Sequence, residues 1–216
     1  MWPSWRRPAA LPAGVRGYRL GWRDRSGGRL VAQVDVLFAG YVGDRVAGTV
    51  TLVRSGDRVI VVDPGMVPER AAILQPMFDL GVQPRDVTDV VLSHHHPDHT
   101  VNIALFPEDA RVHDHWAVYT RDVWDSRPAE GVALTPEVRL LETPGHTPQD
   151  ISTVVETDDG VVVLTHLWWN GDIAPDPKAV DGDAVRRNRG RVLEIASLIV
   201  PGHGAAFAAA DAPVWT

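Results

Sequence analysis

The stretch of sequence that decides the fold lies at residues 93–99 and reads Ser93-His94-His95-His96-Pro97-Asp98-His99. It places histidines and an aspartate in H-x-H-x-D-H spacing, and imidazole nitrogens with a carboxylate suit Zn²⁺ and similar divalent metal ions. The apolar residues at 90–92, Val-Val-Leu, precede it and predict a buried strand. A strand that ends in such a run holds its ligands rigidly beside a cleft, so one short loop could serve two neighbouring metal ions.

The composition is that of an ordinary globular protein. Hydrophobic residues make up 44% and charged residues 23% of the 216 residues. No stretch approaches the roughly 18 apolar residues of a membrane span, so we expect no membrane partner. The chain has no cysteine. Disulfides and thiolate ligands are therefore excluded, and any metal must be held by nitrogen and oxygen atoms.

Charge is distributed unevenly along the chain. Residues 1–30 form a basic segment rich in tryptophan and arginine, with seven arginines against one aspartate, a charge of +6. Because the whole chain carries −7, the remainder carries −13. An acidic body disfavours non-specific nucleic-acid binding, so a small-molecule substrate is favoured as partner. We see no signal peptide and expect a cytoplasmic location. Only one of the 21 basic residues is lysine, which suggests a GC-rich bacterial genome.

Apolar periodicity predicts one domain spanning residues 1–216, with a strand-rich core at about 31–207. We expect strands over the ranges 31–38, 46–54, 58–62, 89–92, 110–113, 138–142, 151–156, 161–165 and 198–200. We expect helices over 69–80, just after residue 99, over 114–121 and over 184–196, and loops over 126–136 and 172–183. This order favours an α/β (α+β) fold in which two mixed sheets pack together with helices outside.

Four further polar residues lie past the C-terminal ends of predicted strands: Asp63, His146, His166 and His203. Because strand ends converge at one edge of a sheet, a β-scaffold can assemble one site from such distant residues. Asp63 precedes Pro-Gly, so a turn-forming role is its plainer alternative. His113 and His115 receive no ligand role, since surface or capping positions suit them better.

These motifs resemble those of the metallo-β-lactamase fold superfamily of metal-dependent hydrolases, and small single-domain members come nearest. The resemblance rests on Asp63, the H-x-H-x-D-H run, Pro-Gly-His at 144–146 and Pro-Gly-His-Gly at 201–204. It implies a four-layer αββα sandwich with a binuclear metal site. It also implies that His94, His96 and His146 hold one metal, and that Asp98, His99 and His203 hold the other. Asp63 would orient a ligand histidine by accepting its free N–H.

His166 departs from the superfamily pattern, because most two-metal members have a bridging aspartate at this position. Two metals in such sites lie about 3.5–4 Å apart, and one imidazole cannot bridge so close a pair because its nitrogens point away from each other. We therefore expect His166 to bind one metal, with the second metal held more weakly or absent. A pocket histidine that binds no metal is the alternative, and Asp172 could supply the missing carboxylate.

The resemblance further implies a metallohydrolase with one or two zinc ions, or iron or manganese. It would use metal-bound hydroxide on an ester, thioester, lactone or phosphodiester. Asp98 would orient the attacking hydroxide, which makes it the candidate catalytic residue. Trp168 and Trp169 could line a substrate cleft or pack at the edge of the sandwich. Three alternatives stay open: a mononuclear iron oxygenase of the sulfur dioxygenase type, an RNA-cleaving nuclease, and a non-catalytic metal-binding protein. The oligomeric state is also open.

Overall fold

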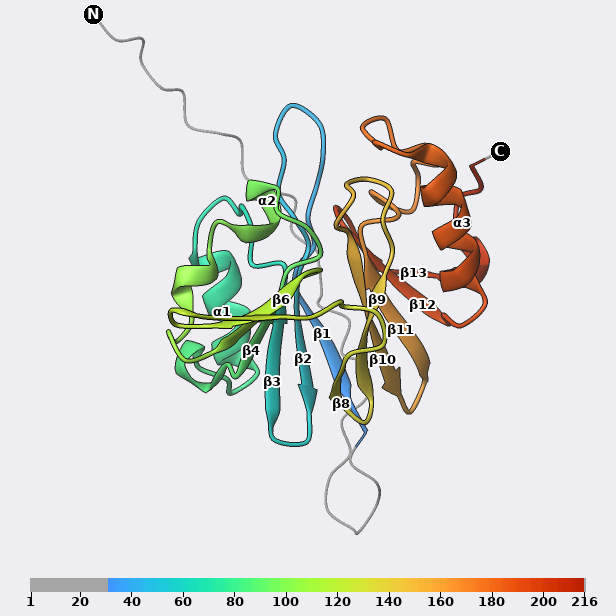
Figure 1. The fold of residues 1–216 in the computed structure, drawn as a ribbon. Coiled ribbons are helices and arrows are strands. Elements are labelled where there is room, and N and C mark those ends of the chain that lie inside the picture. The colour runs from blue at the N-terminus through green and yellow to red at the C-terminus, as the bar shows by residue number, and fades with distance from the viewer. Residues whose placement is uncertain (1–30, 216) are drawn as a thin grey trace, which may run out of the picture.

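Two β-sheets pack face to face in the computed structural model, which describes residues 31–215; the basic segment at 1–30 lies outside the described residues (Figure 1). The first sheet contains, in spatial order, β1 (Gln33–Phe38), β2 (Val50–Ser55), β3 (Arg58–Val62), β4 (Asp89–Val91), β5 (Arg111–His113), β6 (Ala117–Thr120) and β7 (Val123–Ser126). The second contains β13 (Phe207–Ala208), β12 (Leu198–Pro201), β11 (Gly160–Thr165), β10 (Ile151–Thr157), β9 (Val138–Glu142) and β8 (Ala133–Thr135). Both sheets are mixed, because β3, β4 and β5 run parallel, as do β11 and β12.

Helices cover the outer faces of both sheets. Helix α1 (Ala71–Asp79) lies on the first sheet and α3 (Gly182–Leu193) on the second, as Figure 1 shows. The shorter helices are α2 (Pro97–Thr100), η1 (Pro84–Asp86), η2 (Ile103–Leu105) and η3 (Ala209–Asp211). The predicted αββα sandwich is confirmed. Within residues 31–215, no helix has the length and apolar content that crossing a membrane requires.

The alternation of side chains along the strands builds three apolar layers. On β3, Val62 packs between the two sheets while Val61 packs beneath α1, against Met77. On β4, Val91 likewise packs between the two sheets and Val90 packs in the layer beneath α1. These strands are therefore buried on both faces, which explains why they read as continuous apolar runs rather than as an alternating pattern.

The structure corrects the predicted helix over 114–121, which is instead the hairpin of β6 and β7. The Asp114 carboxylate accepts the backbone N–H groups of Trp116 and Ala117, which turns the chain back at the end of β5. Arg121 then takes a positive φ of 54° in the tight turn between the two strands. The short apolar run 117–119 fits a strand as well as a helix, so periodicity did not separate them.

Smaller corrections concern the ends of elements. The predicted strand over 46–54 begins only at Val50, because Gly48 N–H and Thr49 N–H bond to the backbone oxygens of Asp98 and Gly202 in the site loops. The predicted loop over 126–136 contains the short strand β8, and helix 184–196 runs instead from Gly182 to Leu193. The helix expected after residue 99 begins earlier, since Pro97 occupies its first turn.

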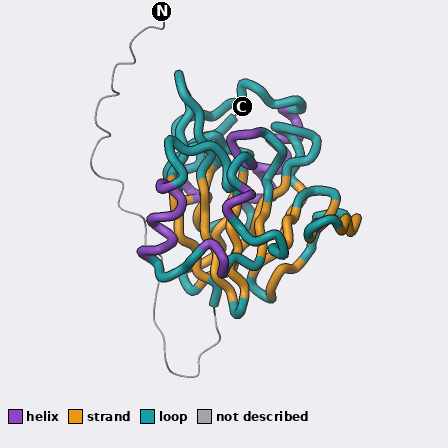
Figure 2. Tube along the Cα trace, turned by 90° about the vertical axis from the view of Figure 1, so that its left-hand side faces the viewer, coloured by secondary structure: helices purple, strands orange, loops and turns teal. Residues whose placement is uncertain are grey.

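The parallel strands end together at one edge of the sandwich. Figure 2 shows the strands in the lower part of the molecule and the loops gathered above them. The H-x-H-x-D-H run follows β4, and the loop with His146 follows β9. His166 and His203 follow β11 and β12, which are parallel neighbours in the second sheet. The fold therefore brings side chains from four distant segments to one place.

Candidate metal centre

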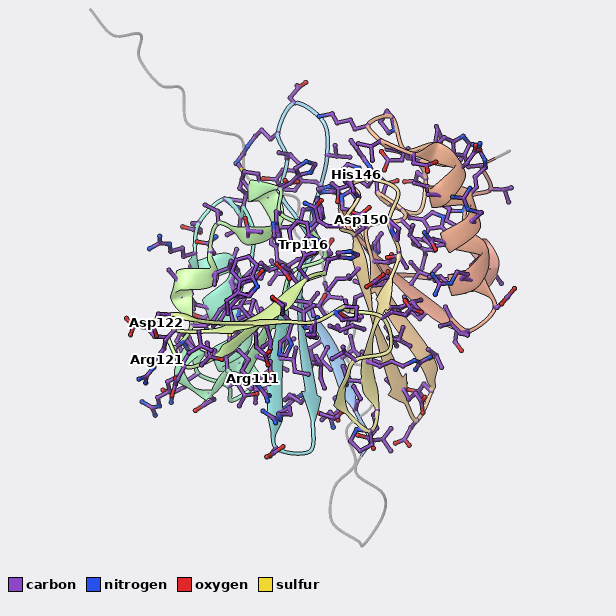
Figure 3. All side chains as sticks on the ribbon, in the orientation of Figure 1. Arg111, Trp116, Arg121, Asp122, His146 and Asp150 are labelled. Carbon is purple, nitrogen blue, oxygen red and sulfur yellow. The ribbon has the colours of Figure 1, made fainter. Side chains whose placement is uncertain are left out.

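Six histidines from both sheets gather at this edge: His94, His96, His99, His146, His166 and His203. Among the described residues, two sets of ligand atoms lie within 4.8 Å of one another, one from His94, His146 and His166 and one from His99, His166 and His203. His146 projects from the β9–β10 loop near the junction of the two sheets (Figure 3). The sequence-predicted histidines thus meet in one cluster.

The first group consists of His94, His96 and His146. The Nδ1 atom of His96 lies 3.0 Å from His94 Nε2 and 3.2 Å from His146 Nε2. A tetrahedral metal at 2.0–2.1 Å from each imidazole nitrogen would separate those nitrogens by roughly 3.3 Å. The spacing and the donor type therefore fit a first-row divalent ion such as zinc. His96 is exposed, so this side of the centre is open to solvent.

The second group consists of Asp98, His99 and His203. The Asp98 carboxylate lies 3.5 Å from His99 Nε2 and 3.6 Å from His203 Nε2. His99 Nε2 is buried and has no hydrogen-bond partner within residues 31–215. A buried polar atom without a partner is costly in a folded protein, and it is aimed at two other metal-ligand atoms. This arrangement also fits a metal ion.

Each of four histidines is fixed through its outward nitrogen. His94 Nδ1 lies 3.0 Å from Ser93 Oγ, His203 Nδ1 lies 3.0 Å from the Ala47 carbonyl oxygen, and His99 and His146 pair with carboxylates. When one ring nitrogen donates outward, the other keeps its lone pair for a metal. The backbone and second-layer side chains therefore set the tautomer that metal binding requires.

Asp63 organises the β4 end of the site. Its carboxylate lies 2.9 Å from His99 Nδ1, accepts the Ser93 N–H at 2.7 Å and accepts the Ser93 hydroxyl at 2.6 Å. Asp63 also has a positive φ of 53°, so the turn-forming alternative describes its backbone while the orienting role describes its side chain. One residue thus fixes the start of the ligand run and one ligand within it.

Asp176 holds His146 in the same way, and sequence reasoning missed it. Its buried carboxylate lies 2.9 Å from His146 Nδ1 and accepts the Lys178 N–H at 2.9 Å. The buried Arg189 guanidinium fixes this loop by donating to the carbonyl oxygens of Leu167 and Ala174. The one sequence signal was an Asp-Pro pair in the loop expected over 172–183, which marks a turn rather than a partner for histidine.

His166 lies between the two groups. Its Nε2 is 3.1 Å from His203 Nε2, and its ring centroid is 4.6 Å from that of His94 and 4.2 Å from that of His146. Its Nδ1 is buried and has no hydrogen-bond partner in the described part of the chain. The histidine therefore occupies the place from which a ligand could reach either group.

The glycine before His203 is required by this packing. A Cβ atom at Gly202 would lie 2.4 Å from Cδ2 of His166, and one at Gly65 would lie 1.7 Å from the backbone oxygen of Asp98. Neither position leaves room for a side chain. The Pro-Gly sequences that mark the motifs thus allow the backbone to approach the ligand loops closely.

The electrostatics favour neutral imidazoles. Burial, together with repulsion from the neighbouring histidines, lowers the pKa of His94, His166 and His203, and the pKa of the more exposed His96 is lowered by the same causes. Burial also acts on His99, but the Asp63 carboxylate outweighs it and raises the His99 pKa. Neutral imidazole is the form that binds metal, so the cluster holds most of its histidines ready for it.

The two tryptophans after His166 have different surroundings. Trp168 is completely buried in the apolar layer beneath α3, so the predicted role in a substrate cleft is wrong for it. The Trp169 ring centroid lies 6.2 Å from His146 and 5.6 Å from His203, and covers one side of the cluster. Asp172 is exposed and belongs to neither group of ligand atoms in the described part of the chain.

The fold and this donor geometry define a metallo-β-lactamase-type protein. A sequence profile described as the Metallo-beta-lactamase superfamily matches residues 43–203, and the chain belongs to this superfamily.

Its relatives include metallo-beta-lactamase domain-containing protein 1 of Mus musculus, 36% identical over 164 residues, which cover 68% of this chain and 60% of that protein. The protein of the same name from Xenopus laevis is 32% identical over 188 residues, which cover 81% of this chain and 80% of that protein.

Solved structures share the fold. A candidate metallo-beta-lactamase from Thermotoga maritima superposes with a TM-score of 0.65 at 24% identity, covering 82% of this chain and 99% of that one. A quorum-quenching N-acyl homoserine lactone lactonase gives 0.59 at 19% identity, covering 81% and 92%. A chemotaxis sensor with a peroxy diiron species gives 0.63 at 15% identity, covering 90% and 89%. At these identities the likeness concerns the fold.

Proposed function

We propose that this chain is a zinc-dependent hydrolase that cleaves an ester, thioester or lactone bond in a small molecule. The observation that carries the proposal is the convergence of inward-facing histidine nitrogens with the Asp98 carboxylate at one open edge of the sandwich. Hydrolase chemistry on this scaffold uses such donor sets, and the lactonase among the structural neighbours is one solved example of the reaction class.

The protein's own residues would divide the work. His94, His96 and His146 would hold one zinc ion, and Asp98, His99 and His203 a second, with His166 on one of them. Bound zinc would polarise the substrate carbonyl and supply a water whose pKa is near 7. Asp98 has two carboxylate oxygens and its side chain is 17% exposed, so one oxygen can hold metal while the other accepts a proton from the attacking water. Trp169 would exclude bulk water from the second group.

Charge argues against a polyanionic substrate. The chain beyond residue 30 carries a net charge of −13, and association with RNA depends on cationic contacts to phosphates. We therefore retain phosphodiester cleavage, and RNA cleavage in particular, only as an alternative. The predicted cytoplasmic location and bacterial source stay predictions.

A mononuclear iron oxygenase is the second candidate, and one specific observation favours it. His94, His146 and His166 bring their ligand atoms within 4.8 Å of one another, and these are the three positions that hold iron in the sulfur dioxygenase arrangement. Histidine in place of a carboxylate at 166 gives the set more neutral donors, which suits zinc as well as iron.

Elemental analysis after purification without added metal separates the two candidates. We expect one or two zinc ions per chain and hydrolysis within a panel of thioester, lactone, lactam and bis(p-nitrophenyl) phosphate substrates. His94→Ala should abolish both zinc binding and hydrolysis, while His95→Ala, a matched change in the same loop, should leave both unchanged. Iron alone at one per chain, or full hydrolysis by His94→Ala, would overturn the proposal.

A further inference from the structure

A cleft opens directly beside the second group of ligands. Its volume is about 470 Å³, and His203 forms part of its lining. The cleft lies between the β1–β2 loop, which contributes Tyr41, and the loop after β11 together with β13, which contribute Asn170 and Phe207 respectively. Small-molecule sites commonly enclose about 300–1,000 Å³. The cleft is thus large enough for a substrate group attached to a bond held at the metal centre.

Among residues 31–215, the cleft lining includes two carboxylates and no lysine or arginine. Asp172 and Asp211 both line the cleft and both are exposed. Neither side chain has an ion-pair or hydrogen-bond partner within residues 31–215. Arg45 stacks on the Tyr41 ring at 5.9 Å but does not line the cleft. The charge that these described residues present to a ligand in the cleft is therefore negative.

The wall that carries Asp172 is held in shape. Asn170 Oδ1 accepts the backbone N–H groups of Asp172 and Ile173, both at 2.9 Å. A Cβ atom at Gly171 would lie 3.3 Å from Cδ1 of Phe207, so the two loops pack closely. The opposite wall is fixed to the metal centre, because Thr49 Oγ1 accepts the N–H groups of both Gly40 and Gly204. The backbone that carries Asp172 therefore has a defined position relative to His203.

We propose that this cleft binds the substrate group next to the scissile bond, and that Asp172 and Asp211 select an uncharged or cationic group and reject an anionic one. The inference rests on the proposed function, because the cleft acquires this role through its contact with the metal centre. A cleft of this volume is roughly 10 Å across, which is close to the Debye length in physiological salt. A ligand charge inside it is therefore weakly screened from both carboxylates. Tyr41 and Phe207 supply apolar and aromatic surface for an uncharged group.

Thiols of matched length test this selectivity without requiring turnover. On zinc-loaded protein, each thiol can bind metal through sulfur and place its other end in the cleft. Calorimetry would measure the affinities of 2-aminoethanethiol, 2-mercaptoethanol and 3-mercaptopropionate, which carry a cationic, a neutral and an anionic end. The Asp172→Asn/Asp211→Asn variant is compared with Asp158→Asn/Asp159→Asn. The control pair makes the same change in net charge in the exposed β10–β11 turn, at the opposite end of β11 from His166.

In the cleft variant we expect the affinity ratio of the anionic to the cationic thiol to rise about tenfold, and less at 0.5 M salt. The control pair should change the ratio less than twofold. An unchanged ratio in the cleft variant, or an equal change in both variants, would overturn the inference. So would loss of zinc in Asp172→Asn alone, because Asp172 would then be a metal ligand. Failure of the whole ester, thioester and lactone panel, with the thiol selectivity intact, would count against the proposed function alone.

Discussion

Two H-x-H stretches follow adjacent parallel strands of the same sheet, and only one of them enters the metal centre. The first, at 94–96, follows β4, and the second, at 113–115, begins with the last residue of β5. His94 has one nitrogen fixed by Ser93 and the other directed at His96. His113 has both nitrogens occupied, Nε2 by the buried Asp89 at 2.8 Å and Nδ1 by Arg127 at 3.2 Å.

The difference lies in what each histidine does with its second nitrogen. Spacing alone treats the two stretches alike, since each could present two imidazoles at the end of a strand. At 113–115 the intervening residue, Asp114, turns the chain into the β6–β7 hairpin and bonds to Tyr119 and His95. At 94–96 the chain continues into α2 and brings in Asp98 and His99. Among the described residues, the candidate metal centre is thus distinguished by several histidine nitrogens that face one another, whereas the second stretch leaves a single buried nitrogen, Nδ1 of His115, without a partner.

The largest expected effect comes from mutating the first histidine of each H-x-H stretch and comparing the two variants. His94→Ala should lose at least one zinc ion per chain and reduce hydrolysis by about 1,000-fold or more, because the metal and its activated water are lost together. His113→Gln should keep its zinc but lower the free energy of unfolding by about 1–3 kcal/mol, since Asp89 is left with a poorer partner in a fully buried position. Zinc analysis and denaturant unfolding measure the two effects. Zinc loss in the His113 variant would contradict the comparison.

Removing a carboxylate that orients a candidate ligand histidine should have the next largest effect, a loss of metal affinity. Asp63→Asn and Asp176→Asn each remove the anionic partner of a ligand imidazole, at His99 and His146 respectively. Metal-orienting partners of this kind typically contribute about 10–100-fold to affinity. We expect competition with a chelator to show a loss of that size in each variant. Asp57→Asn is the control, since its side chain is 95% exposed in the β2–β3 turn; an equal loss there would attribute the effect to net charge.

Much of this site could be predicted from sequence, because strand ends carry its histidines. Apolar runs predict strands, parallel strands end at one edge, and the candidate ligands His146 and His203 follow such runs. Asp176 could not be predicted, since it lies 30 residues beyond its partner His146 in a loop without periodicity. The β6–β7 hairpin was missed because the three-residue apolar run at 117–119 fits either type of element. What sequence left out is the set of contacts made by loops, which depend on the tertiary structure.

His166 gives a third way to sharpen the comparison, because it replaces the carboxylate that a two-metal site of this superfamily usually shares. His166→Asp should tighten binding of the second zinc ion by about tenfold, since a carboxylate adds negative charge beside two dications and offers two oxygens. Stepwise zinc titration by calorimetry measures this directly, with His166→Asn as the neutral control of similar size. If the second zinc ion binds equally well in the wild-type chain and in His166→Asp, then His166 already supplies what the carboxylate would.

The smallest expected effect is a pH dependence of the metal-free protein. Four histidines of the centre, His94, His96, His166 and His203, have pKa values lowered by burial and mutual repulsion. The unfolded chain, with histidine pKa values near 6.5, therefore takes up more protons than the folded chain below that pH. Stability present at neutral pH is lost as the pH falls. His99, whose pKa is raised, changes the stability in the opposite direction, but it is a single residue against the four histidines whose pKa values are lowered.

We expect the melting temperature of the zinc-free chain to fall by about 5 °C or more between pH 7 and pH 5. His166→Asn removes one buried histidine of lowered pKa and should reduce this fall, whereas His115→Asn, in the second H-x-H stretch, should not. Differential scanning calorimetry after chelator treatment provides the measurement. An equal fall in both variants would mean that the acid sensitivity arises outside the cluster. The histidine cluster would then differ from the second H-x-H stretch in metal binding alone.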